Sequence, residues 1–305
     1  MSVSAPMNMP TTWPVTQLAS QHQAALISMQ AHSEMTRCAY EKWIQRLRVW
    51  MEDRSLNLND LSDATLGEWV HDLAAQGLAP ASVSLAVSAA AWLAKSAHLP
   101  PVRGQLVADS LRIIRRDYAD RAKPLRKPLD AEAVARVRGH INDQADSNEK
   151  SARDMALISV LAEGGLRRSE AAALDWNDLQ TAADGSGRLT IRRSKTDQES
   201  VGAVVAISAQ AMTDLERLAS LRRNRHGSIF GIEANTINCI VKRITGAAGL
   251  GTGYTAHSGR IGMAQRMTKN SAPSAAIMRQ GRWASSRMIA TYTRSLDAGE
   301  AVRYL

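Results

Sequence analysis

The stretch EGGLRRSE, residues 163–170, combines two glycines with basic and acidic side chains. Arg167 and Glu170 are three residues apart, so they share a face if the segment is helical. Glycine lets a backbone come close to a bound anion, and a guanidinium makes two parallel hydrogen bonds to phosphate oxygens. The stretch therefore suits a phosphate. Taken alone, it fits an ordinary ion pair at a helix start even better.

A second candidate is YTAHSGRIGMAQRM, residues 254–267. His257 and Arg260 are three residues apart and would project from one side of a helix, while Gly259 and Gly262 keep the adjoining surface low. At a helix start they would offer an anion a charge, a directed donor and a favourable helix dipole. A histidine in this place is more often a capping residue than a catalyst.

A third candidate lies in RQGRWASSRMIATYTRSL, residues 279–296. Trp283 supplies an indole N–H in a predicted loop, and a short helix that begins at Ser285 or Ser286 carries Tyr292. Either Tyr292 is one more packing residue of this amphipathic helix, or its hydroxyl reacts. Its predicted face also holds Met288, Ile289 and Leu296.

Lys195 lies in the polar tip of a predicted hairpin. The strands are an alternating run at 189–193 and a second run at 201–207, and RRSKTDQES lies between and around them. Lysines at hairpin tips are usually solvated. A lysine on such a tip could also reach into a site and give a proton to a leaving oxygen.

The charge of the chain favours a polyanionic partner. The 305 residues include 38 Lys and Arg against 29 Asp and Glu, a formal charge of +9. Residues 101–129 alone hold eight basic and three acidic residues, so the basic excess begins at a junction. Nucleic acid is the simplest partner of this kind, although many basic proteins bind none.

Cysteine use and hydropathy indicate the compartment. Cys38 and Cys239 are far apart without metal-ligand spacing, and we expect reduced, partly buried thiols. No apolar run approaches the ~20 residues that a membrane span needs, and no signal peptide pattern precedes the first helix. We expect a soluble, cytoplasmic protein with no membrane partner.

Length and pattern predict two domains. Residues 1–20 are predicted to be a mobile tail, 21–120 a helical domain, 121–129 a basic proline-containing linker, and 130–305 a domain of mixed pattern. The linker is either a solvated connection or a segment that follows a phosphate backbone. Helices are predicted within the stretches 36–55, 61–77, 80–100 and 106–121, with Gly77 as a stop signal and Pro100 beyond the end of the third helix. Further helices are predicted at 130–141, 152–163, 209–222, 234–247, 257–267, 272–279 and around residue 292.

The chemistry-bearing residues occur in the order Arg167, Glu170, Lys195, His257, Arg260, Trp283, Tyr292. This ordered set resembles the tyrosine recombinase (phage integrase) family, whose motifs are GLRxxE, a hairpin Lys, HxxR, His or Trp, and a C-terminal Tyr. The resemblance covers 130–305, and the helical segment before it resembles the family's core-binding domain. It implies a mainly α protein, with a helical core-binding domain and an α+β catalytic domain that has a small antiparallel sheet or hairpin.

The resemblance also implies a reaction. Tyr292 would attack a DNA phosphate and form a 3′-phosphotyrosyl intermediate, while Arg167 and Arg260 bind the non-bridging oxygens. Lys195 would protonate the departing 5′-oxygen, and His257 would assist proton transfer at the tyrosine. The phosphodiester energy stays in the protein–DNA bond, so no metal and no other cofactor is expected.

Two further residues receive supporting roles from the resemblance. Trp283 would donate a hydrogen bond to the phosphate, and Glu170 would orient its neighbours. Arg168 is a rival of Arg167, but the family motif places the arginine directly after Gly-Leu. The remaining tyrosines are poorer candidates for the nucleophile; they are Tyr40, Tyr118, Tyr254 and Tyr304.

The implied partner is double-stranded DNA with paired inverted-repeat sites, bound by a homotetramer, with accessory DNA-bending proteins as an option. The short tail after Tyr292 leaves docking into a neighbouring subunit the weakest part of the resemblance. Basic residues of the helical domain and linker are candidate DNA contacts, although a solvated face is an equal alternative: Arg112, Arg115, Arg116, Lys123, Arg126 and Lys127.

Other functions stay open at this point. A type IB topoisomerase or a telomere resolvase would use the same chemistry with a different DNA outcome. A catalytically silent DNA-binding relative is the non-enzyme alternative. The sequence does not indicate the target site, since base contacts depend on side chains that spacing cannot identify.

Overall fold

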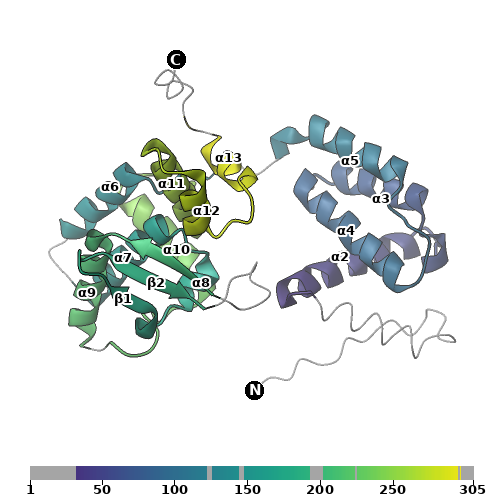
Figure 1. The fold of residues 1–305 in the computed structure, drawn as a ribbon. Coiled ribbons are helices and arrows are strands. Elements are labelled where there is room, and N and C mark those ends of the chain that lie inside the picture. The colour runs from purple at the N-terminus through teal and green to yellow at the C-terminus, as the bar shows by residue number, and fades with distance from the viewer. Residues whose placement is uncertain are drawn as a thin grey trace, which may run out of the picture. The chain divides into compact units, whose positions relative to one another are not determined.

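A computed structural model describes residues 32–121, 126–143, 148–192, 202–223, 225–294 and residue 296 (Figure 1). By its internal contacts the chain divides into two compact units, Met1–Lys123 and Pro124–Leu305. The described part is mainly helical with one small antiparallel sheet, which confirms the predicted fold class. None of the described helices is long and apolar enough to cross a membrane.

The first unit is a bundle of helices around an apolar core. Ser62 caps α3 by accepting the N–H of Thr65 at 3.2 Å, and Pro80 is the first residue of α4, as their sequence positions predict. The largest fully buried core side chain is Trp69. The helices are α2 (Glu34–Glu52), α3 (Asp63–Ala75), α4 (Pro80–Ser96) and α5 (Gln105–Asp117), with 3-10 turns at Leu58–Asp60 and Ala119–Arg121.

The second unit packs helices on both sides of α7. Asp130 caps α6 by accepting the N–H of Ala133 at 2.9 Å. The helices are α6 (Ala131–Asn142), α7 (Glu149–Gly164), α8 (Arg168–Ala172), α9 (Ala209–Arg222), α10 (Ala234–Ala247), α11 (Ala256–Lys269), α12 (Ser274–Gly281) and α13 (Arg287–Thr293), with a 3-10 turn at Trp176–Asp178.

The sheet has the order β1–β2–β3 and is antiparallel throughout. Its strands are β1 (Leu179–Thr181), β2 (Gly187–Ile191) and β3 (Ala203–Ile207). Leu189 lies opposite Val205, and α7 and α9 pack against the sheet. The buried hydrophobic residues alternate along β2 and β3, as a half-buried sheet requires: Leu189, Ile191, Val205 and Ile207.

The structure also differs from the predicted elements. The helix predicted at 152–163 begins at Glu149, because the Asn148 side chain caps it by accepting the N–H of Ser151 at 2.9 Å. Strand β1 was not predicted, since three residues hold no alternating pattern. Both cysteines are exposed, so the expectation of partly buried thiols is wrong.

Residues 127–129 of the predicted linker pack on the second unit. The backbone N–H of Lys127 donates to the Gly253 carbonyl at 3.1 Å, and that of Leu129 donates to the Ser258 carbonyl at 3.0 Å. The Leu129 side chain is fully buried. Residues 127–129 are therefore attached to the segment that leads into α11 rather than surrounded by solvent.

Helix α11 lies unusually close to its neighbours because it carries two glycines at the contacts. A Cβ on Gly259 would lie 2.2 Å from the Leu161 carbonyl oxygen of α7, and a Cβ on Gly262 would lie 2.0 Å from the Leu129 carbonyl oxygen. These glycines therefore set the depth at which α11 sits in the unit. The sequence predicts only that these glycines leave room beside His257 and Arg260. In the structure they also allow close packing of the backbone.

We predict that Gly259→Ala lowers the free energy of unfolding of the second unit by about 1–3 kcal/mol, because the added methyl group forces backbone apart. Urea unfolding followed by circular dichroism measures the change. Gly139→Ala in α6 is the matched control, since a Cβ there meets nothing within 4 Å. That control should be neutral or gain up to about 1 kcal/mol. Equal stability of the two variants would contradict the packing argument.

Candidate active site

Arg167 is fixed by Glu170 at the start of α8. Helix α7 ends where Gly165 adopts the left-handed conformation with φ of 54°. The chain then reverses, and the Glu170 carboxylate accepts the Arg167 backbone N–H at 2.8 Å and its Nη1 at 2.7 Å. The Glu170 side chain is 2% exposed. The predicted pair is therefore formed, and it is largely buried.

Arg260 extends from α11 into the same region. Its Nη1 donates to the Gly165 carbonyl at 2.7 Å and its Nη2 to the Gly281 carbonyl at 2.7 Å. Burial, followed by the charges of Arg167 and Arg282, lowers the pKa of the Arg260 guanidinium to about 10, so it stays charged at neutral pH. The two bonds use two of its five N–H groups.

The Tyr292 ring lies next to the rings of both Trp283 and His257. It is stacked on the Trp283 ring with centroids 5.0 Å apart, and the His257 ring centroid is 5.3 Å away. Met288 and Ile289 pack with Tyr292 against a small cluster that connects α11, α12 and α13 (Figure 1). The helical periodicity around Tyr292 thus serves docking, and docking places the phenol beside the histidine.

Trp283 has a donor that the described residues leave unsatisfied. Its side chain is buried, and its Nε1 has no hydrogen-bond partner in the described part of the chain. The Arg260 guanidinium carbon lies 5.2 Å from the centre of the Trp283 ring. A buried N–H without an acceptor costs about 1–3 kcal/mol, and an incoming anion would recover that cost.

His257 is neutral in this environment. Burial, followed by the positive charges of Arg260, Arg126 and Arg167, lowers the pKa of its imidazole from 6.5 to about 4. At neutral pH the ring therefore has a nitrogen that can accept a proton. The Tyr292 ring is its neighbour, with the two ring centroids 5.3 Å apart.

The structure brings five of the predicted residues together around Glu170: Arg167, His257, Arg260, Trp283 and Tyr292. Lys195 and Lys123 lie outside the described residues. Arg126 hydrogen-bonds the Thr255 hydroxyl at the start of α11 and so lies near His257. Lys127 contacts the same segment, with Nζ 5.7 Å from the Tyr254 ring centre.

The three arginines predicted in the helical domain lie on α5. Arg112 pairs with Asp109 at 2.8 Å, and Arg116 pairs with Asp117 at 2.6 Å. Both arginine side chains are 76% exposed, so these ion pairs hold them weakly. The Arg115 guanidinium donates to the Ser84 hydroxyl at 3.3 Å.

Sequence reasoning missed two residues of this region. Arg282 is 5% exposed and donates to Glu170 at 2.7 Å. Gln265 donates from Nε2 to the Tyr292 carbonyl at 3.1 Å and so attaches α13 to α11. The one hint that the sequence gives for Arg282 is its place between Gly281 and the predicted site residue Trp283. Nothing in the sequence pattern indicates Gln265.

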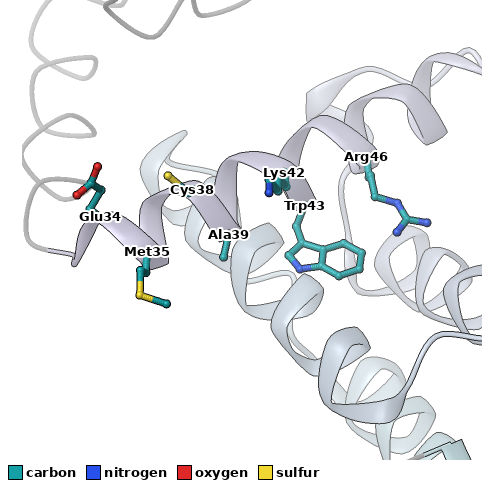
Figure 2. A pocket seen from close by; sticks show the side chains of 7 residues that line it. All are labelled: Glu34, Met35, Cys38, Ala39, Lys42, Trp43 and Arg46. Carbon is teal, nitrogen blue, oxygen red and sulfur yellow. The ribbon is translucent and has the colours of Figure 1, made fainter. Parts of the chain in front are cut away.

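A hollow of about 620 Å³ lies elsewhere, along α2 of the first unit (Figure 2). Its lining comes from that one helix, so a small molecule there would be covered on one side only: Glu34, Met35, Cys38, Ala39, Lys42, Trp43 and Arg46. Across the described residues, no group of three or more His, Cys, Asp or Glu could hold a metal ion.

Comparison with known proteins gives a family match over most of the chain. The phage integrase family matches residues 129–298, and the phage integrase N-terminal SAM-like domain matches residues 19–97. No curated protein matches the chain. Trp283 and the segment after it also look like those of Cre recombinase, a likeness of sequence pattern alone.

Solved structures with the same fold include three recombinases or integrases. XerH site-specific recombinase bound to palindromic difH substrate has a TM-score of 0.70 at 16% identity, with 93% of this chain and 83% of that chain covered. Tn1549 transposon integrase with transposon right end DNA has 0.65 at 14% identity, covering 93% and 98%. A lambda integrase dimer on a COC′ core site has 0.61 at 18% identity, covering 92% and 97%.

We predict a pH dependence of stability that originates at His257. Its pKa is lower in the folded chain than in the unfolded chain, so the unfolded chain binds more protons between pH 6.5 and about 4. The free energy of unfolding should therefore fall as pH drops through this window, by up to about 3 kcal/mol. His257→Asn should flatten that part of the profile, measured by urea unfolding from pH 7.5 to 4.5. Parallel profiles for the two proteins would contradict a buried neutral imidazole.

Proposed function

The chain belongs to the phage integrase family, and we propose that it is a site-specific DNA recombinase that uses Tyr292 as its nucleophile. The observation that carries this proposal is the position of Tyr292 next to His257 and Trp283, with Arg260 beside the same Trp283 ring and Arg167 held by Glu170. The family match does not favour the topoisomerase, telomere-resolvase or catalytically silent alternatives.

The proposed reaction is a transesterification at a DNA phosphate. The Tyr292 oxygen forms a bond to phosphorus while the bond from phosphorus to the 5′-oxygen breaks, which leaves a 3′-phosphotyrosyl linkage. Charge builds on the non-bridging oxygens as the fifth bond forms. We assign the stabilisation of that charge to Arg167 and Arg260, and the unsatisfied indole N–H of Trp283 would be a further donor.

Two protons have to move in this step. The Tyr292 hydroxyl loses its proton as it attacks, and neutral His257 is the neighbouring group able to accept it. The departing 5′-oxygen gains a proton, and we assign that donation to Lys195 between β2 and β3. Neither transfer requires another molecule, and the reverse sequence rejoins the strands.

The partner proposed for this chain is double-stranded DNA with paired inverted-repeat sites. Among the related structures, XerH recombinase is bound to a palindromic substrate, and lambda integrase is a dimer bound to a core site. We propose that residues 21–120 form a core-binding domain, 121–129 a linker and 130–305 the catalytic domain. The residues that would contact DNA phosphates are Arg112, Arg115, Arg116, Lys123, Arg126 and Lys127. A homotetramer on DNA, with optional accessory proteins, completes the proposal.

Tyr292→Phe should abolish the covalent protein–DNA adduct while DNA binding persists, because only the nucleophilic oxygen is removed. A nicked DNA substrate that traps the adduct, resolved by denaturing gel electrophoresis, measures this. Tyr118→Phe in the first unit is the control and should form adduct like the wild type. Adduct formation by the Tyr292→Phe protein would refute the nucleophile assignment.

Lys195→Ala should slow cleavage by about 10²–10⁴-fold if the lysine is the general acid. A substrate with sulfur in place of the 5′-bridging oxygen separates this role from a binding role, because a thiolate leaves without a proton. On that substrate the variant should cleave within about tenfold of the wild type. A defect of equal size on both substrates would remove Lys195 from the acid role.

A further inference from the structure

Arg282 occupies a backbone position that disfavours its residue type. It ends α12 in the left-handed conformation, with φ of 52° and ψ of 52°. Glycine is the usual residue at such an end, because a Cβ is crowded there. The other described non-glycine residues with positive φ are exposed, whereas the Arg282 side chain is 5% exposed; they are Ser55, His98, Arg223 and Ser271.

The guanidinium of Arg282 binds three separate segments. Its Nη1 donates to the carbonyls of Gly164 and Gln280, both at 3.1 Å. Its Nη2 donates to the Gly165 carbonyl at 2.9 Å and to Glu170 Oε2 at 2.7 Å. One side chain therefore holds the end of α7, the first turn of α8 and the end of α12 together.

These contacts connect Arg282 to both proposed phosphate-binding arginines. Glu170, which it binds through one carboxylate oxygen, binds Arg167 through the other. The Gly165 carbonyl, which it also binds, accepts the Nη1 of Arg260 at 2.7 Å. Arg282 thus shares one acceptor with each arginine.

We infer that Arg282 is a positioning residue for the phosphate site: it fixes Glu170 and the Gly165 carbonyl, and through them the separation and direction of Arg167 and Arg260. This inference rests on the proposed function. Arg282 is also the residue before Trp283, so its anchored backbone sets where the indole begins. No contact between Arg282 and DNA is required.

The charge balance supports the same role. The guanidiniums of Arg167, Arg260 and Arg282 lie close together, and Glu170 supplies one carboxylate. The cluster therefore has a net positive charge. Burial and the charge of Arg167 lower the pKa of Arg282, and Glu170 opposes that shift. Because Glu170 is shared, it neutralises Arg167 only in part, which leaves Arg167 able to attract a phosphate.

The test is single-turnover cleavage of the trapping substrate by Arg282→Gly and Arg282→Lys in the full chain. Glycine suits the left-handed backbone, so the first variant removes the guanidinium without adding strain. We expect cleavage to slow by about 10²-fold or more, since small misplacements of catalytic groups have effects of that size. The DNA dissociation constant should change by less than about threefold. Arg282→Lys keeps the charge and should recover part of the rate.

Arg222→Met is the matched control for a merely structural effect. Arg222 also binds a glutamate and two carbonyls, at 2.6 Å to Glu149, 2.6 Å to Ile229 and 3.0 Å to Phe230. Its loss should lower the melting temperature and leave the cleavage rate of the folded protein unchanged. If Arg282→Gly does not fold, the cleavage rate of the Arg282→Lys protein is compared with that of Arg222→Met instead.

A double-mutant cycle, with the cleavage rate as its readout, tests whether Arg282 acts through Glu170. Because part of the effect of Arg282 passes through Glu170, the rate loss of Arg282→Gly combined with Glu170→Gln should be smaller than the product of the two single losses. Multiplied defects, a wild-type rate in both Arg282 variants, or an equal rate loss in Arg222→Met would overturn the inference. Absence of adduct with the wild-type protein would instead remove the proposed function.

Discussion

The buried carboxylate of Glu170 is the interaction on which the candidate site depends. It accepts Arg167 and Arg282 at 2.7 Å each, and its own side chain is 2% exposed. Burial raises the pKa of this carboxyl, but Arg282 and Arg167 together hold it below the ordinary value. Loss of the carboxylate would leave the buried Arg282 and the half-buried Arg167 without this counter-charge, which is far more costly than loss of a surface ion pair. The ends of α7 and α12 and the start of α8 therefore have to meet at this point.

Close backbone contacts make that meeting possible. Gly165 turns the chain at the end of α7, and a Cβ there would lie 2.7 Å from Met263. Gly259 and Gly262 bring α11 against α7 and against the extended segment at Leu129. Because α11 carries both the histidine and the second arginine of the site, its depth in the unit fixes where those groups lie. The glycines thus position the charged residues, because the lack of a side chain lets the neighbouring backbones approach closely.

Local signals account for most of the helices that the sequence predicts. The helices at 209–222 and 234–247 have the predicted bounds, and Ser208 caps the first by accepting a backbone N–H. Motif spacing also singled out several residues that the structure brings close together, among them Arg167, His257 and Tyr292. Arg282 and Gln265 escaped prediction because their partners lie 112 and 27 residues away in the chain. A guanidinium in a left-handed turn has no periodic pattern, so only the folded structure gives it a role.

The cluster around Glu170 has more positive than negative charge, which suits it to bind an anion. Arg260 keeps its charge although burial and its neighbours lower its pKa to about 10, and the indole N–H of Trp283 lacks an acceptor among the described residues. Each of these costs stability in the free protein, and each is relieved by one oxyanion placed among the same donors. Such donors need no rearrangement as charge develops on a phosphate. The donors whose burial costs stability are therefore the ones that would stabilise a transition state, and the Glu170 carboxylate helps to hold them in place.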